Sequence, residues 1–285
     1  MANHYVTRDR LKHALGIPDD STNDDPLVDA AIDGVSREID KYLGFALYPA
    51  IRTRRFRTAY SDRLYLYPPM QSLHSPLLSL ITVRVDPGGD TTFETTYSTA
   101  DFVLRPFNAP TMAPAEPYWE IWARSGSTAS FPPNVEDGVE VIGTFGYFDL
   151  RDNTTATPTS GHGATDTTIT ITGATSLHPG QTILMGAEQL FIRDVNLQAS
   201  GIIVDRGVNG TTATTHSSAT SVQIYRYDEI ERLALYQAGQ DFRWTPSGAG
   251  AGGGILGSEP PAAMVGGLHP FVRRRLDMFR EPIAR

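Results

Sequence analysis

The sequence predicts an α+β protein: a small helical bundle built from N- and C-terminal helices, with a large β-rich insertion of two units. Apolar residues recur at helical spacing near both ends of the chain, whereas a period of two dominates the long middle stretch. The 26 glycines and 20 prolines supply turns between short strands. At 285 residues, the chain can hold one large domain or several small ones.

Two helices are predicted at the N-terminus. Thr7 is a good N-cap for a short first helix, and the acidic loop 19–24 separates it from a second, longer one. Asp25 is the predicted N-cap of the second helix, Pro26 takes the first helical position, and Gly44 ends the helix. Its apolar face is predicted to be a core or inter-subunit surface, formed by Val28, Ile32, Val35, Ile39 and Tyr42.

The middle of the chain is predicted to form two β units. Residues 48–151 form the first, and 152–226 form a small inserted module that begins with a Thr/Ser/Gly-rich linker. In the first unit, the period of two predicts strands over 52–57, 63–67, 78–85, 102–104, 118–122 and 139–145. In the module, it predicts strands over 168–172, 182–185, 188–195, 202–205 and 221–225, with a hairpin turn at Gly186-Ala187.

The C-terminal part returns to helical spacing. Asp228 caps a third helix, with Glu231 as its capping-box partner. A linker rich in Gly, Ala and Ser follows, and residues 270–280 are predicted to form a last short helix. The predicted division is therefore 1–47 (N-terminal helical part), 48–151 (β domain), 152–226 (inserted module), 227–244 (C-terminal core helix) and 245–285 (linker and C-terminal arm).

Charge is distributed unevenly along an acidic chain of net charge −8. A net acidic body opposes a firm grip on DNA phosphates. Residues 51–67 contain five arginines and one aspartate. For the strand 52–57 within them, we favour a solvated or salt-bridged sheet face over a DNA path. The C-terminal arm mixes aromatic residues with arginine, as binding hot spots do. Its candidate partner-binding residues are Phe271, Arg273, Arg274, Arg275, Phe279 and Arg280.

The sequence contains no recognisable catalytic or metal-binding pattern, so we expect a non-enzymatic protein without cofactor or metal. The absence of cysteine excludes disulfides, thiolate metal sites and a cysteine nucleophile. None of the seven histidines has metal-pair spacing, and the three in 152–226 are expected on solvent-facing loops. Residues 205–211 are expected to form tight turns. We also expect no membrane partner and no secretory signal, because the apolar runs are short.

Several segments, taken in order, resemble the head–tail connector (adaptor) proteins of tailed bacteriophages. The opening through Asp25–Gly44 resembles the start of that family, and Val141–Tyr147 resembles its strand before the later helix. Residues 231–239 and 267–273 resemble its C-terminal portion. Residues 168–222 resemble a small β module that recurs in phage virion proteins.

This resemblance implies a structural virion protein at the capsid portal vertex, or neck, assembled in the host cytoplasm. It implies a homo-oligomeric ring, typically a dodecamer, that binds the portal protein and the next neck or tail-completion protein. Double-stranded DNA would pass through the lumen without sequence readout. The alternative is a fibre or decoration protein that binds carbohydrate or another virion surface through 152–226. A further alternative is an enzyme acting on cell-wall polysaccharide, which would need a carboxylate pair in a deep pocket.

Overall fold

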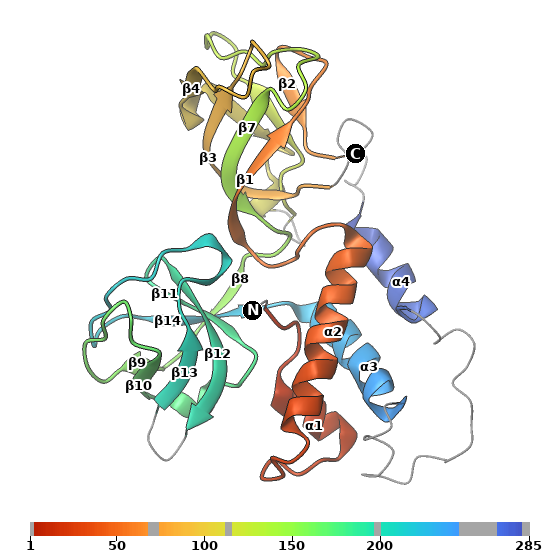
Figure 1. The fold of residues 1–285 in the computed structure, drawn as a ribbon, viewed down its shortest axis with the longest axis vertical. Coiled ribbons are helices and arrows are strands. Elements are labelled where there is room, and N and C mark those ends of the chain that lie inside the picture. Colours follow the sequence, from red (N-terminus) through yellow and green to blue (C-terminus); the bar gives the residue numbers. More distant parts are fainter. Residues whose placement is uncertain (1–2, 68–73, 112–115, 197–200, 245–266, 281–285) are drawn as a thin grey trace. The chain divides into compact units, whose positions relative to one another are not determined.

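The computed structural model describes residues 3–67, 74–111, 116–196, 201–244 and 267–280 (Figure 1). Within these residues the chain forms four α-helices and fourteen strands, and the strands pair antiparallel in three sheets. This confirms the α+β class and its large β content. The chain divides into two compact units: unit 1 comprises Met1–Tyr42 and Leu150–Met278, and unit 2 comprises Leu43–Asp149 and Phe279–Arg285.

The four helices occupy the predicted positions, with shifts at two caps. They are α1 (Arg8–Leu15), α2 (Asp25–Leu43), α3 (Asp228–Trp244) and α4 (Pro270–Leu276). Thr7 caps α1 as predicted, because its hydroxyl accepts the N–H of Arg10 at 3.4 Å. The predicted cap of α2 is wrong by one residue, since the carbonyl of Asp24 accepts the N–H of Val28 at 2.9 Å. The Asp25 carboxylate instead binds side chains of α1. The predicted cap of α3, Asp228, is wrong by one residue, since the carbonyl of Tyr227 accepts the N–H of Glu231 at 3.3 Å.

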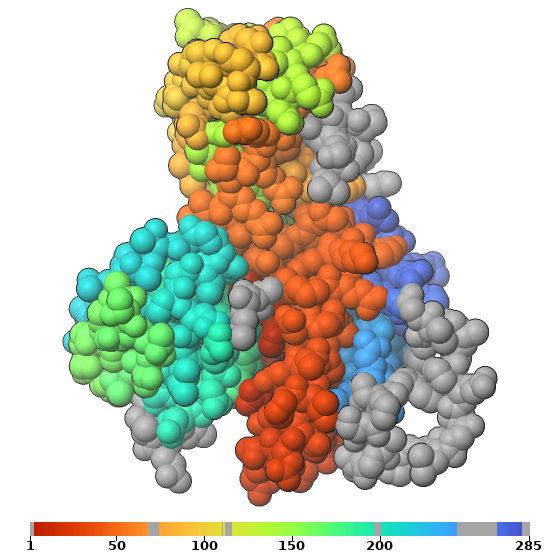
Figure 2. All heavy atoms as spheres, viewed as in Figure 1, coloured from red at the N-terminus to blue at the C-terminus, as the bar shows by residue number. Residues whose placement is uncertain are grey.

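Hydrogen bonds and ion pairs tie the helices of unit 1 together. The backbone N–H of His269, just before α4, donates to the side chain of Gln237 on α3 at 2.8 Å. The Tyr42 hydroxyl on α2 donates to Asp277 at 2.6 Å. Residues of α1 also contact α3, and Figure 2 shows the orange surface of α2 beside the blue surfaces of α3 and α4. Fully buried apolar side chains from three of these helices are Val28, Ile32, Ile39, Ile230, Leu233, Ala234, Ala238, Val272 and Leu276.

The rest of unit 1 is a seven-stranded sheet with the order β8-β14-β11-β12-β13-β10-β9. Its strands are β8 (Leu150–Asn153), β9 (Thr157–Pro158), β10 (Thr168–Thr172), β11 (Thr182–Met185), β12 (Glu188–Asn196), β13 (Gly201–Asp205) and β14 (Val222–Arg226). The two end strands, β8 and β9, belong to one short stretch of chain, so the sheet curls into a small barrel (residues 150–226). The predicted hairpin is confirmed, since Met185 pairs with Glu188 across a two-residue loop with Gly186 at φ +62°.

Unit 2 contains a four-stranded sheet of order β1-β7-β3-β4 and a three-stranded sheet of order β2-β6-β5. The strands are β1 (Ala50–Phe56), β2 (Arg63–Tyr65), β3 (Leu77–Val85), β4 (Thr95–Tyr97), β5 (Phe102–Arg105), β6 (Glu120–Ala123) and β7 (Val139–Phe145). Buried residues of both sheets form one core, including Phe56, Leu64, Val83, Phe102, Ile121, Phe131 and Val141. A Cβ at Gly143 would lie 2.5 Å from the carbonyl oxygen of Ser79, so the close approach of β7 to β3 requires glycine there.

The other helical segments of the described residues are single 3-10 turns, and one of them continues the last predicted helix. They are η1 (Thr99–Asp101), η2 (Ala109–Thr111), η3 (Ala174–Ser176), η4 (Val208–Gly210) and η7 (Asp277–Phe279). The helix predicted over 270–280 is therefore α4 followed by η7. Most of the linker predicted at 245–268 lies outside the described residues, which resume at residue 267. Among the described helices, none has both the length and the hydrophobicity needed to cross a membrane.

Candidate interaction surfaces

The N-terminal segment, residues 3–6, is fixed to the barrel by buried side chains. The side-chain amides of Asn3 and Asn209 donate to each other's carbonyl oxygens at 2.9 and 3.1 Å. The Thr182 hydroxyl also donates to Asn3, which is 2% exposed. His4 packs edge-on to Phe191 of β12, with ring centroids 5.1 Å apart. The barrel is thus joined to the helical part through the first residues of the chain.

We expect that Asn3→Ala loosens this attachment, because the Thr182 hydroxyl and the Asn209 side chain both lose their hydrogen bonds to Asn3, although the Asn209 amide keeps its bond to Gln189. The cost should be about 1–3 kcal/mol. Hydrogen exchange should quicken at the backbone amides of residues 4–6 in particular. Asn23→Ala, on the exposed loop before α2, is the matched control. Unchanged exchange at residues 4–6 in Asn3→Ala would contradict the attachment.

Two basic residues of α1 hold α1 and α2 together. The Arg8 guanidinium donates to Asp29 at 2.6 and 2.9 Å and to Asp25 at 3.2 Å. The Lys12 side chain is almost fully buried, and its ammonium donates to the Asp25 carboxylate at 2.9 Å. The same ammonium donates to two backbone carbonyls of the loop before α2, at 2.8 and 2.9 Å. Lys12 therefore satisfies all three of its donors inside the protein.

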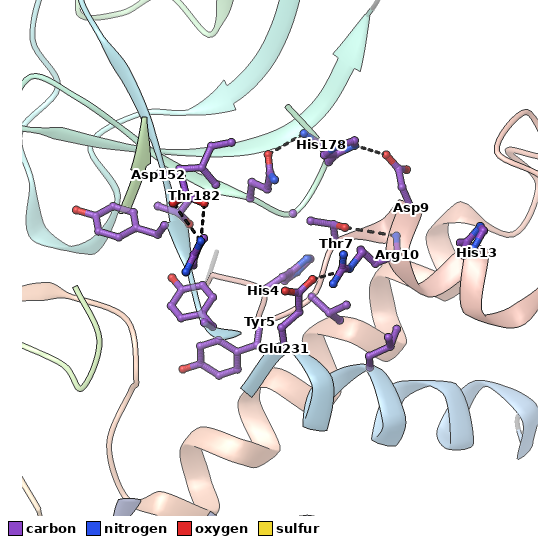
Figure 3. A pocket seen from close by; sticks show the side chains of 18 of the residues that line it. His4, Tyr5, Thr7, Asp9, Arg10, His13, Asp152, His178, Thr182 and Glu231 are labelled. Carbon is purple, nitrogen blue, oxygen red and sulfur yellow. Dashed lines mark hydrogen bonds and ion pairs between the residues drawn. The ribbon is translucent and has the colours of Figure 1, made fainter. Parts of the chain in front are cut away.

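A groove of about 670 Å³ lies between the N-terminal segment, the barrel and the start of α3 (Figure 3). Ion pairs line it: His178 with Asp9 at 2.6 Å, Arg10 with Glu231 at 2.8 Å, and Arg226 with Asp152 at 2.9 Å. The hydrogen bond with His178 lowers the pKa of Asp9. Two of these pairs link α1 to the barrel or to α3. The charged side chains of the groove thus connect α1 with the barrel and with α3 within unit 1.

The barrel contains a buried charge network centred on Glu188, which is 0% exposed. Its carboxylate accepts two bonds from Arg206 at 2.7 and 2.8 Å, one from the N–H of Gly207 and one from the N–H of Thr214 at 2.9 Å, and it contacts Nε2 of His216 at 2.8 Å. Burial alone would raise the pKa of Glu188, but these hydrogen bonds outweigh it and bring the pKa down to about 2. The network therefore attaches the loop after β13 to Glu188 at the start of β12.

This network corrects one prediction and confirms another. The histidines of the module were expected to face solvent, but His162 and His216 are only 8% and 6% exposed. The expectation is wrong for these two because the backbones of His162 and His216 pair with each other and His216 contacts Glu188. The tight turns predicted in 205–211 are confirmed, since Gly207 and Asn209 have φ of +58° and +59°.

The predicted apolar face of α2 lies inside the chain. Val28, Ile32, Val35 and Ile39 are at most 1% exposed, and Tyr42 is half-buried and bound to Asp277. The hydroxyl of Ser36 on the same helix donates to the carbonyl of Ile32 at 2.7 Å and accepts the N–H of Tyr5 at 3.2 Å.

The candidate C-terminal arm residues have mixed surroundings. Phe271 is 44% exposed beside Tyr236, Arg274 is exposed, and Arg275 lies 3.6 Å from Glu229. Arg273 lies near Glu38 of α2. Burial and the Asp241 carboxylate raise the pKa of Glu38, and Arg273 opposes part of that rise. Phe279 and Arg280 belong to unit 2, where Phe279 packs edge-on against Tyr147 and Phe148.

The arginines of β1, together with the one that follows it, are partly salt-bridged, which agrees with the sheet face favoured from the sequence. Arg55 lies 3.4 Å from Glu140, and Arg57 lies 3.5 Å from Glu136. Arg54 differs: it lies over the ring of Phe145 and donates to Ser75 at 2.7 Å. Burial, with a smaller effect from Arg52, lowers the pKa of Arg54 to about 10.

Among the described residues, one group of three acidic side chains could surround a cation: Asp86, Asp90 and Glu94. The Asp86 carboxylate already accepts the N–H groups of Gly89 and Thr91 at 2.7 Å. These bonds give Asp86 a role in the turn after β3.

Comparisons with known proteins give one solved structure. Neither the protein-family models nor the curated proteins give a match to this chain. The solved structure is described as the neck of an empty GTA particle computed with C6 symmetry. Its matching chain is 19% identical, with a TM-score of 0.33, and the alignment covers 50% of this chain and 65% of that chain. The present chain thus spans less than two thirds of the length of the chain it matches.

Proposed function

We propose that this protein is a structural component of a virion neck: a head–tail connector (adaptor) that forms a ring between the portal and the next neck protein. One observation carries the proposal. Three segments that resemble the connector family, far apart in sequence, form α2, α3 and the start of α4, and all three lie in unit 1. The contacts of His269 with Gln237 and of Tyr42 with Asp277 support a small helical bundle built from both ends of the chain.

The proposed role needs no catalytic residue. The charged residues of the groove and of the Glu188 network are used in structural pairs, which supports a non-enzymatic function. Identical subunits that contact head-to-tail can close into a ring, and twelve copies is the number we propose. A net charge of −8 would let DNA pass through the lumen without adhering to its wall.

Electron microscopy of purified particles tests this proposal. The expected result is density for this chain as a closed ring at the portal vertex, with a pore wide enough for duplex DNA. Gold-labelled antibody against the barrel should mark the same vertex. Label at fibre tips or spread over the capsid surface would contradict the connector and favour the fibre or decoration alternative. Binding of the purified chain to surface polysaccharide would be the matching biochemical outcome of that alternative.

A further inference from the structure

The outer face of the three-stranded sheet in unit 2 carries large aromatic and arginine side chains. Arg63 on β2 pairs opposite Trp122 on β6, and Tyr65 pairs opposite Glu120. The intervening Ile121 is fully buried, so the alternation of the strand directs these four side chains outward. All four are half-buried. An outward sheet face is ordinarily polar, and this one is dominated by aromatic rings.

Two guanidinium groups lie against the indole of Trp122. The Cζ atoms of Arg63 and Arg105 are 4.6 and 5.3 Å from its ring centroid, and the indole N–H donates to Glu120 at 2.6 Å. Arg63 is also paired with Asp62 at 3.0 Å. Arg105 is exposed, and although Glu120 is its cross-strand partner on β6, no ion pair joins Arg105 to a carboxylate among the described residues. Its guanidinium is therefore positioned by the ring while its N–H donors remain available for a carboxylate.

One more exposed ring contacts this face, and another follows Arg105 in sequence. Tyr60 is 38% exposed and packs edge-on to Tyr65 with centroids 5.7 Å apart. Phe107, two residues after Arg105 in sequence, is 67% exposed, the highest value among the large apolar side chains described. Tyr, Trp and Arg dominate binding hot spots between proteins. We call this surface the Arg–Trp face and define it by Tyr60, Arg63, Tyr65, Arg105 and Trp122.

The chain also presents a complementary acidic surface, the loop of residues 19–24. The buried Lys12 ammonium binds the backbone carbonyls of Asp19 and Ser21 at 2.9 and 2.8 Å, which holds the loop in one conformation. The Asp19 and Asp20 side chains are exposed, and neither has a cationic partner among the described residues. A loop held in advance loses little conformational entropy on binding.

We propose that the Arg–Trp face binds the acidic loop 19–24 of a second copy of this chain. The contact joins two different surfaces, so it can repeat from copy to copy around a ring. This proposal rests on the proposed function, which requires copies of the chain to associate, and it assigns the two surfaces that make the contact. Asp62 and Glu120 lie within or beside the face, so the proposed contact depends on Arg105, which forms no ion pair among the described residues.

Charge reversal in the full-length chain tests the contact. Arg105→Glu, and separately Asp19→Arg with Asp20→Arg, should each weaken self-association at least tenfold in sedimentation velocity. The chain carrying all three changes should recover association, because the charges are exchanged across the contact. Arg57→Glu is the matched control: it reverses an exposed arginine of unit 2 outside the face. Circular dichroism melting should show every variant folded.

A cross-link provides a second measurement that also detects weak association. The chain has no cysteine, so Arg105→Cys with Asp20→Cys creates the only thiols, and oxidation should give a ladder of multimers. Absence of that ladder, or failure of the exchanged charges to restore association, would overturn the proposal. The proposal would also be overturned if Arg105→Glu lost binding to a labelled single-stranded oligonucleotide while its self-association stayed intact. If particles show a neck ring while these variants assemble normally, the contact is wrong and the connector function stands.

Discussion

Glu188→Gln is expected to destabilise the barrel by about 3–5 kcal/mol, because it leaves the buried Arg206 guanidinium without its counter-charge. Glu188 is 0% exposed, and the side chain of Arg206 is 6% exposed, so water cannot replace the lost partner. Gln also cannot accept all the bonds that reach the carboxylate from Arg206, Gly207, Thr214 and His216. Urea denaturation followed by circular dichroism gives the free energy of unfolding.

The control for this variant is Asp205→Asn in the same barrel. It removes the ion pair with Arg193, whose two side chains are 27% and 47% exposed, and should cost less than about 1 kcal/mol. Equal effects of the two substitutions would show that the Glu188 network does not stabilise the fold.

The free energy of unfolding should also depend on pH because of the Glu188 network. Because the folded-state pKa of Glu188 is about 2 and its ordinary value is 4.5, unfolded chains take up a proton at a higher pH than folded chains do. The stabilisation is fully present above about pH 4.5 and is lost as the pH falls toward 2. Glu188→Gln lacks this titration, so its stability should depend less steeply on pH across that window. A parallel pH dependence in both proteins would contradict the assignment.

Ile39→Ala is expected to lower the free energy of unfolding by about 2–5 kcal/mol, since Ile39 is fully buried on the apolar face of α2. The loss should appear even at concentrations where the protein is monomeric, because the burial lies within one chain. Leu27→Ala on the same helix is the control: Leu27 is 37% exposed, and its truncation should cost less than about 1 kcal/mol.

A different outcome would assign this face of α2 to an interface. If Ile39→Ala weakened self-association and left the unfolding of the monomer unchanged, the face would act between subunits. Thermal melts at several protein concentrations separate the two cases, because only an interface makes the melting temperature depend on concentration.

Local pattern predicted most of the secondary structure. Alternation placed β10 and β12, and the capping residue Thr7 placed α1, because these signals act within a few residues of chain. Three strands were missed: β4, β8 and β9 span only two to four residues and show no alternating apolar run. Their backbones are extended because they pair with β3, β14 and β10, and that information lies elsewhere in the chain.

The candidate surfaces were less predictable. The Arg–Trp face was missed, although Arg63, Tyr65 and Trp122 occupy alternating positions of predicted strands. Their proximity depends on the register between β2 and β6, which the sequence does not state. Glu188 and Arg206 were missed for the same reason: they stand 18 positions apart in sequence, yet their side chains lie 2.7 Å from each other.

The sequence by itself determined the α+β class, the places of the helices and most strands, and the acidic charge, because these depend on composition and short-range periodicity. The packing of distant segments, by contrast, fixes the barrel to residues 3–6, brings Lys12 to the acidic loop and places Arg105 against Trp122. Each of these depends on side chains brought together by strand register or by packing of distant segments. Burial then sets their energies, since a charge or amide removed from water must find its partner within the protein.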